Sequence, residues 1–420
     1  MNLAELRSMV GSIVDYDPDV QTYKDEMSRL LNETYLDFMT SKPWTFVQET
    51  RDIDVYADKS GTGSITTVTP SVVSSAGIGF EGWMAGQQVQ ISGSTSNDGF
   101  YTIAKVLSAT QVSLDAFTAA VIEAGITVKV RHEYIDLPED CIDVLSIGVR
   151  RQDQSNRMTF SSLSAHTDEE LALNLDQTGQ PTDWVEVEPA SVVQPITAPV
   201  LASGGGGTFP DGSYSVKVTH VSQNKESAPS PAGVFLSVGG PNRLDVSDLR
   251  LTGSAGSGIL KRVYLKTPDS QAYWAVTNAD AGEIDTTLAN ILLDGSYLAR
   301  GTRLPEHDGF YKRIRLYPRQ SSNLKIRVRY IQRPEVLIDD TDVPDYPASH
   351  HQYLVYAACH DIFTKHDSLN HATLYKRKAE TEMLRLENRF LSSGASHWVM
   401  GQFQQEVRTY RHKTSLTHLG

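Results

Sequence analysis

Residues 312–331 have the sequence KRIRLYPRQSSNLKIRVRYI, and this stretch decides which fold the chain is expected to adopt. Apolar and basic side chains alternate in both halves, which is the period of a β-strand with one buried face. We predict a β-hairpin with strands over 312–317 and 324–331 and a turn over 318–323. Its apolar face comprises Ile314, Leu316, Ile326, Val328 and Tyr330. Its basic face comprises Arg313, Arg315, Lys325, Arg327 and Arg329.

This basic face stands out because the rest of the chain is acidic. Residues 310–333 contain 8 Lys and Arg and no Asp or Glu, whereas residues 49–309 contain 17 Lys and Arg against 32 Asp and Glu. A formal net charge of -13 argues against a protein that binds nucleic acid through its overall charge. Two interpretations stay open: a face that is solvated or neutralised by acidic neighbours in a complex, and a face that contacts a nucleic-acid backbone or an acidic partner. We expect assembly more than DNA contact, with acids of a neighbouring subunit as partners.

Helical patterns lie at both ends of the chain. A helix is predicted over residues 17–40, with Asp17 as its cap and Pro18 at its start, and Pro43 prevents its continuation. Its apolar residues recur at spacings of three and four: Val20, Tyr23, Met27, Leu30, Leu31, Tyr35 and Phe38. Residues 347–392 are also predicted to be helical. A first face there comprises Tyr353, Tyr356, Ala357 and Phe363, and a second helix from about Asn370 presents Ala379, Met383, Leu386 and Phe390.

Two stretches between these ends are predicted to be all-β. Residues 57–131 alternate in short segments, with Asn97-Asp98-Gly99 as a hairpin turn. Residues 132–191 contain strands over 144–149 and 184–187 and a short helix that starts at 167–170. A linker over 195–207 ends in the glycine run 204–207, and a second β unit follows to about Arg300. The glycine runs 204–207 and 253–258 are interpreted as linkers or turns.

The predicted fold class is therefore α+β and multidomain. A helical bundle with the β-hairpin forms a core from both chain ends, and two all-β domains are inserted into it. The predicted boundaries are 1–56, 132–191 and 305–393 for the core, 57–131 for a small β domain, 192–304 for a β-sandwich, and 394–420 for an extended C-terminal tail.

Signatures of several functional classes are missing from the sequence. The glycine runs lack the spacing of phosphate-binding loops, and no GxSxG nucleophile motif occurs. Cys141 and Cys359 are the only cysteines, too few for a zinc ribbon or a disulfide framework. Five histidines, His350, His351, His360, His366 and His371, do not share one helical face. We expect no enzyme activity, no catalytic or metal site and no cofactor.

Membrane and export signals are not expected either. No stretch approaches the roughly 18 uninterrupted apolar residues of a membrane span. The first residues contain Glu5 and Asp15 and no apolar segment, so no secretory signal is predicted.

The C-terminal tail carries widely spaced aromatic and basic residues in a polar sequence. Disorder is one interpretation, and ordering on a partner, with the aromatic side chains as anchors, is the one we favour. The candidate partner-binding residues are Trp398, Phe403, Tyr410, Arg408 and Arg411.

Several of these segments together resemble the head-to-tail adaptors of tailed bacteriophages, the connector proteins of the tail-tubular-A type. The resemblance covers roughly residues 1–56, 131–190 and 305–392. It rests on Lys42-Pro43-Trp44-Thr45-Phe46, Ile135-Asp136-Leu137-Pro138-Glu139-Asp140, Ile314-Arg315-Leu316-Tyr317-Pro318, Ile326-Arg327-Val328-Arg329-Tyr330 and Pro344-Asp345-Tyr346-Pro347.

The inserts resemble modules of phage virion proteins. Residues 83–114 are similar to a small β domain of tail and connector proteins. A fibronectin-III or immunoglobulin-like sandwich is suggested by Asp211-Gly212-Ser213-Tyr214, Glu226-Ser227-Ala228-Pro229-Ser230 and Arg262-Val263-Tyr264.

The resemblance implies a structural protein of the virion neck, assembled in the cytoplasm of the host bacterium. It implies a homo-oligomeric ring of twelve subunits, with the portal protein above, the tail tube or nozzle protein below and the C-terminal segment docked on the portal. DNA would pass through an axial channel without sequence-specific contact. The alternative function is a β-modular tail-fibre or baseplate component that binds a host receptor or a carbohydrate.

Overall fold

The computed structural model divides the chain into two compact units, Met1–Glu49 with Tyr330–Gly420, and Thr50–Arg329. Strands β1 and β27 cross the boundary between them. The structure describes residues 1–17, 19–68, 71–115, 119–152, 158–166, 177–192, 194–222, 225–237, 242–247, 260–268, 270–278, 282–283, 285–286, 290–293, 297–304 and 309–391.

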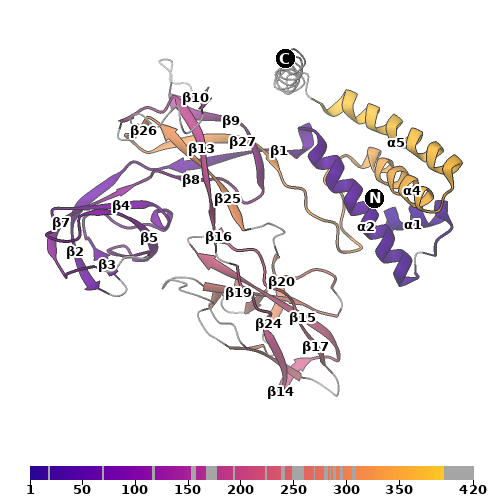
Figure 1. Ribbon diagram of the computed structural model, residues 1–420, viewed down its shortest axis with the longest axis horizontal. Helices are drawn as coiled ribbons and strands as arrows, with labels where there is room; N and C mark the ends of the chain where they lie inside the picture. The colour runs from indigo at the N-terminus through magenta and orange to yellow at the C-terminus, as the bar shows by residue number, and fades with distance from the viewer. Residues whose placement is uncertain are drawn as a thin grey trace, which may run out of the picture. The chain divides into compact units, whose positions relative to one another are not determined.

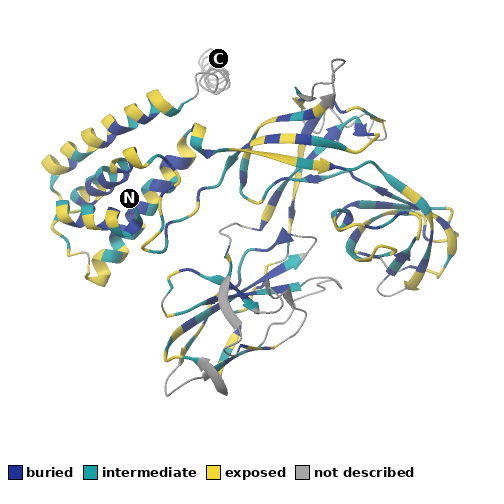
Figure 2. Cartoon of the chain, turned by 180° about the vertical axis from the view of Figure 1, so that it is seen from behind, coloured by how far each residue is buried: buried dark blue, intermediate teal, exposed yellow. Residues whose placement is uncertain are grey.

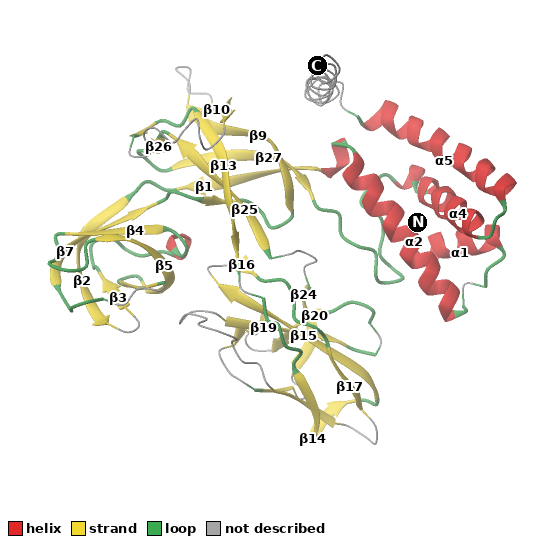
Figure 3. Cartoon of the chain, viewed as in Figure 1, coloured by secondary structure: helices red, strands yellow, loops and turns green. Residues whose placement is uncertain are grey.

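The first unit is a helical bundle built from both ends of the chain (Figures 1 and 3). Its helices are α1 (Leu3–Val14), α2 (Gln21–Ser41), α4 (Gln352–Lys365) and α5 (Leu369–Phe390), with short 3-10 turns η1 (Thr45–Val47) and η4 (Ala348–His350). Helix α4 is central, because α1, α2 and α5 all pack against it.

Helix α1 is not among the predicted elements, and α2 starts later than predicted. A capping box explains the start of α1: the Glu5 backbone N–H donates to the Asn2 side chain at 2.8 Å, and the Asn2 N–H donates to Glu5 at 3.0 Å. The predicted cap Asp17 instead accepts from the backbone N–H of Asp19 at 2.9 Å, a local turn that delays the helix to Gln21. Pro18 lies outside the described residues.

The two chain ends share one hydrophobic core, which the buried faces of the helices form (Figure 2). Leu386 of α5 is fully buried and Ala379 is nearly so, which agrees with the face predicted for that helix. The face predicted for α4 is wrong by nearly half a turn. Its buried residues are Leu354, Val355, Ala358, Cys359 and Ile362, while the predicted Tyr353, Tyr356, Ala357 and Phe363 are only partly buried.

Two four-stranded sheets organise the second unit. One has the order β1-β27-β9-β10, formed by β1 (Gln48–Val55), β27 (Leu324–Gln332), β9 (Cys141–Gln152) and β10 (Met158–Ser162). The other has the order β11-β13-β25-β8, formed by β11 (Ser164–His166), β13 (Asp183–Ser191), β25 (Phe310–Tyr317) and β8 (Ile135–Asp136). The helix predicted to start at 167–170 lies outside the described residues.

The hairpin predicted over 312–331 is wrong, although both strands and their apolar face are correct. Strand β25 pairs with β13 and β8, and β27 belongs to the other sheet. The connecting residues explain the separation. Arg319 and Gln320 form β26 (Arg319–Gln320), which pairs with β12 (Thr178–Gly179). Gln320 also donates to the backbone oxygen of Tyr56 at 2.6 Å. Because this segment is anchored, it cannot act as a free turn, and it directs the chain from the sheet of β25 into the sheet of β27.

Residues 59–131 form a closed six-stranded barrel of order β2-β3-β6-β5-β4-β7, where an all-β unit was predicted (Figure 1). Its strands are β2 (Lys59–Val68), β3 (Ser71–Ser74), β4 (Gln88–Ser92), β5 (Gly99–Ser108), β6 (Gln111–Leu114) and β7 (Ala124–Arg131), with the 3-10 turn η2 (Gly82–Met84). Strands β4 and β5 do form a hairpin, but residues 93–98 connect them rather than a tight turn.

The described strands between residues 200 and 303 form a two-sheet sandwich, and one hydrophobic core contains residues from both sheets. One sheet contains β14 (Val200–Phe209), β18 (Asn242–Ser247) and β23 (Ile291–Leu293). The other contains β15 (Gly212–Ser222), β16 (Lys225–Glu226), β17 (Gly233–Ser237), β19 (Leu260–Lys266), β20 (Trp274–Asn278), β21 (Gly282–Glu283), β22 (Asp285–Thr286) and β24 (Tyr297–Arg303). The fibronectin-III or immunoglobulin-like assignment remains a prediction.

The linker prediction for the glycine run 204–207 is wrong, because these residues belong to β14. Gly204 lies opposite Arg243, and a side chain there would come within 2.8 Å of the Arg243 guanidinium. A side chain at this position would require the end of the Arg243 side chain to shift. The second run, 253–258, lies outside the described residues.

The predicted α+β class is confirmed, since the chain contains one helical bundle and several β modules. Among the described helices, none combines the length and apolar character that crossing a membrane would require.

Candidate functional site: a charged joint between the β modules

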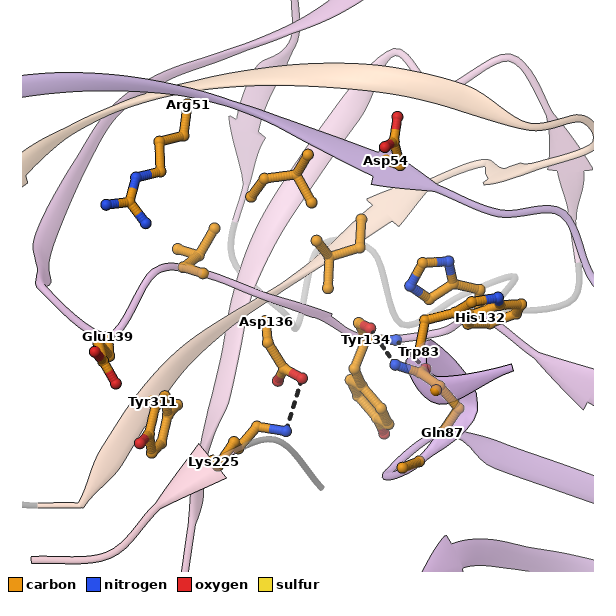
Figure 4. A pocket seen from close by; sticks show the side chains of 15 residues that line it. Arg51, Asp54, Trp83, Gln87, His132, Tyr134, Asp136, Glu139, Lys225 and Tyr311 are labelled. Atoms are coloured by element: carbon orange, nitrogen blue, oxygen red, sulfur yellow. Dashed lines mark hydrogen bonds and ion pairs between the residues drawn. The ribbon is translucent and has the colours of Figure 1, made fainter. Parts of the chain in front are cut away.

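A cavity of about 360 Å³ lies in the second unit, where three parts of the chain meet (Figure 4). The two four-stranded sheets, called the central sheets below, contribute Asp136 of β8, and Tyr134 directly precedes that strand. The barrel contributes Trp83 and Gln87, and the sandwich contributes Lys225. The site is therefore a joint that connects both β modules to the central sheets.

Asp136 is the electrostatic centre of the joint. One of its carboxylate oxygens forms an ion pair with Lys225 Nζ at 2.7 Å, and the other accepts from Arg313 Nε at 2.8 Å. The antiparallel register of β8 and β25 places Arg313 directly opposite Asp136. Lys225 is only 4% exposed, and burial lowers its pKa while Asp136 opposes that shift. One carboxylate thus links the sandwich to a strand of the central sheet.

Tyr134 provides an aromatic platform beside this carboxylate. The guanidinium groups of Arg313 and Arg315 lie 5.5 and 5.2 Å from its ring centre, within the range of cation–π attraction. Arg315 also forms an ion pair with Glu133 at 2.9 Å. Two residues of the predicted basic face are therefore held by groups of the same chain.

The barrel is attached through three aromatic rings in contact and a pair of hydrogen bonds from one side-chain amide. Trp83 stacks on Tyr56 and packs at a tilt against His132, with ring centres 4.7 Å apart in both cases. The Tyr56 backbone N–H donates to His132 Nδ1 at 2.8 Å, so the ring is neutral at that nitrogen. Burial lowers the pKa of His132 to about 4. Gln87 donates to the Tyr134 carbonyl at 2.7 Å and accepts from its N–H at 3.2 Å.

The sandwich is attached through Glu226, next to Lys225 on β16. Its carboxylate accepts from the Tyr264 hydroxyl at 2.7 Å and forms an ion pair with Arg262 at 3.3 Å. Its backbone carbonyl accepts from the Tyr311 hydroxyl at 2.9 Å. Burial is the main cause of the raised pKa values of Tyr264 and Tyr311, so both hydroxyls stay protonated and can donate.

The chemistry of this joint is that of a fixed connection. Buried ion pairs contribute little net free energy, but they penalise any arrangement that separates the partners. Asp136, Gln87 and Glu226 each bond across a junction between modules. The geometry therefore supports one orientation of each β module on the central sheets.

The rest of the predicted basic face is neutralised in the same way. Lys325 pairs with Asp54 at 3.2 Å, and Arg327 pairs with Asp52 at 2.7 Å and lies over the Phe160 ring at 3.9 Å. Arg327 lowers the pKa of Asp52. Arg329 is exposed on the same strand and also has an interaction partner. Sequence reasoning missed these pairings, although Asp52 and Asp54 alternate with the same period as Lys325 and Arg327.

The other predicted groups do not join this site. Trp398, Phe403, Tyr410, Arg408 and Arg411 lie outside the described residues. The histidines of residues 350–371 make separate contacts: His351 with the Tyr346 carbonyl at 2.8 Å and His360 with the Ala372 carbonyl at 3.0 Å. Within the described ranges, no three His, Cys, Asp or Glu side chains are grouped as metal ligands.

Comparison with known families gives one match. The family model described as SU10 adaptor protein matches residues 236–398, which is less than half of the chain. No curated protein and no solved structure matches significantly. The matched segment includes β25, β27, α4 and α5, and it supports a phage adaptor-type protein.

Proposed function

We propose that this chain is a structural, non-catalytic head-to-tail adaptor of a tailed bacteriophage. In this proposal twelve copies form a ring in the virion neck, between the portal above and the tail tube or nozzle below, and DNA passes through its axial channel. The family match over residues 236–398 carries the proposal.

The joint of the second unit agrees with a structural role. A neck protein must hold its modules in a constant orientation while neighbouring rings and DNA exert force on it. Asp136, Gln87 and Glu226 provide such fixed connections within one chain. The net charge of -13 also suits a channel wall along which DNA moves without binding, because carboxylates repel phosphates.

The C-terminal residues complete the proposal. Trp398, Phe403 and Tyr410, with Arg408 and Arg411, are proposed to anchor the chain on the portal protein. Assembly would take place in the host cytoplasm, with no membrane and no cofactor involved.

Labelling intact virions tests the location directly. Antibody fragments against the purified chain should bind at the neck, between head and tail, in electron micrographs. Label at the tail tip or along fibres would contradict the adaptor function and favour a receptor-binding component. Virions of an unrelated phage serve as the control for nonspecific label.

A further inference from the structure

The helical bundle separates opposite charges onto different helices. Helix α4 is central, with α2 on one side and α5 on the other. The ion pair of Lys365 with Glu26 links α4 to α2, and the stacking of Phe363 on Tyr375 links α4 to α5. Charges on the exposed sides of α2 and α5 therefore belong to two distinct surfaces of the bundle.

The exposed surface of α5 is basic and partly apolar. Lys42, at the C-terminal end of α2, pairs with Glu387, so the flank of α5 that carries Glu387 faces this end of α2. Most of the basic residues lie on the outer side and on the opposite flank, and all are exposed: Arg377, Lys378, Arg385 and Arg389. Leu374 and Leu384 are 47% and 58% exposed among them. We call this set of six residues the α5 face.

The described contacts of the α5 face leave its charge largely uncompensated. Arg385 pairs with Glu382, whereas Lys378 lies over the Tyr375 ring at 4.5 Å and Arg389 over the Phe390 ring at 5.3 Å. Such stacking orients a cation without neutralising it. Exposed leucines between unneutralised cations are typical of a surface that binds an acidic partner.

A matching acidic surface lies along α2 and the adjacent edge of α4. Glu33, Asp37 and Asp361 are all exposed there. Burial raises the pKa of Asp361, and His360 opposes that shift. The charge of Glu33 raises the pKa of Asp361 further, which shows that these two carboxylates are close together. Arg29 pairs with Glu33 at 2.6 Å and offsets only part of the charge. We call these three acids the α2 edge.

We propose that the α5 face of one copy docks against the α2 edge of the next copy. The inference rests on the proposed ring. Because the two surfaces differ, the contact is head-to-tail, and repeated head-to-tail contacts close into a ring when the rotation per subunit allows it. The leucines would supply the apolar part of the interface, and the charges would set its polarity and register.

Charge reversal on each surface separately is the first part of the test. One variant carries Arg377→Glu, Lys378→Glu and Arg389→Glu, and the other carries Glu33→Lys and Asp37→Lys. Each should raise the protein concentration needed for assembly at least tenfold, measured by mass photometry. A control variant with Lys376→Glu and Glu380→Lys, on the other flank of α5, should assemble like the unmodified chain. Far-UV circular dichroism verifies that all variants are helical.

Combining the reversals is the decisive part. The variant with all five substitutions has complementary charges again, so it should assemble where each partial variant fails. Rings that persist in both partial variants would overturn this inference and leave the adaptor function intact. A partial α5 variant that keeps its ring but loses binding to duplex DNA would also overturn it. An unmodified chain that never forms rings would instead contradict the proposed function.

Discussion

His132 packs against both the Trp83 and the Tyr56 ring at the base of the barrel, and the fold requires its neutral form. Burial holds its pKa at about 4, against 6.5 for the unperturbed group. The folded chain therefore resists protonation of this ring, whereas the unfolded chain does not. The resulting stabilisation is complete above about pH 6.5, decreases as the pH falls below that value, and is lost by about pH 4.

Replacing His132 with Gln should remove most of this pH dependence. A shift from 6.5 to about 4 corresponds to about 3 kcal/mol of unfolding free energy. The Gln side-chain oxygen can still accept from the Tyr56 N–H, so the barrel should remain docked. Urea unfolding of both proteins at several pH values from 4 to 7 measures the difference. If the unfolding free energy of both proteins changes equally with pH, His132 is not the titrating group.

Asp136 should be far more sensitive to substitution than its charge alone suggests. Asp136→Asn leaves Lys225 and Arg313 without their common carboxylate, and Lys225 is nearly fully buried. We expect a loss of about 2–4 kcal/mol in unfolding free energy, because breaking a buried pair leaves an uncompensated charge. Asp54→Asn removes the exposed pair with Lys325 and should cost less than about 1 kcal/mol. Similar losses for both variants would contradict the central role of Asp136.

At the scale of elements, sequence patterns identified strands well and their partners poorly. The alternation over 312–331 correctly gives Ile314, Leu316 and Ile326 as buried residues. It cannot give the pairing, because β25 and β27 join strands that lie far away in the sequence. The carboxylates that neutralise the basic face also come from distant segments: Asp52 and Asp54 from β1, Asp136 from β8, and Glu133 from the residues before β8. The period of a strand is local information, whereas its neighbours depend on tertiary contacts.

Helix α5 offers a matched pair of leucines to test its packing. Leu386 is fully buried and Leu384 is 58% exposed on the same helix. Leu386→Ala should lower the unfolding free energy of the helical bundle by about 2–5 kcal/mol through a cavity. At protein concentrations too low for ring assembly, Leu384→Ala should change it by less than about 0.5 kcal/mol. Denaturant unfolding followed by circular dichroism at 222 nm measures both, and the reverse order would show that α5 packs through another face.

At the scale of the molecule, the bundle built from both chain ends was predictable because its amphipathic helices need apolar partners. The all-β character of residues 57–131 was predictable from alternation and turn residues, while closure into a barrel was not. The joint was not predictable at all. Lys225 is a single lysine with no local motif, and only the fold brings it to Asp136.

Removing the barrel tests the independence of these parts. Tyr56 and His132 are in contact, so a short Gly-Ser linker can replace residues 59–131. The helical bundle belongs to a separate compact unit and should keep its full circular dichroism signal at 222 nm. A deletion variant that loses its helical signal would show that the bundle depends on the barrel.

The central claim is that this chain forms an adaptor ring, and electron microscopy of the purified protein tests it most directly. Class averages of negatively stained particles should show rings with a central hole, and their rotational symmetry gives the number of subunits. Elongated trimers without a hole would contradict the adaptor account and support a fibre or baseplate component.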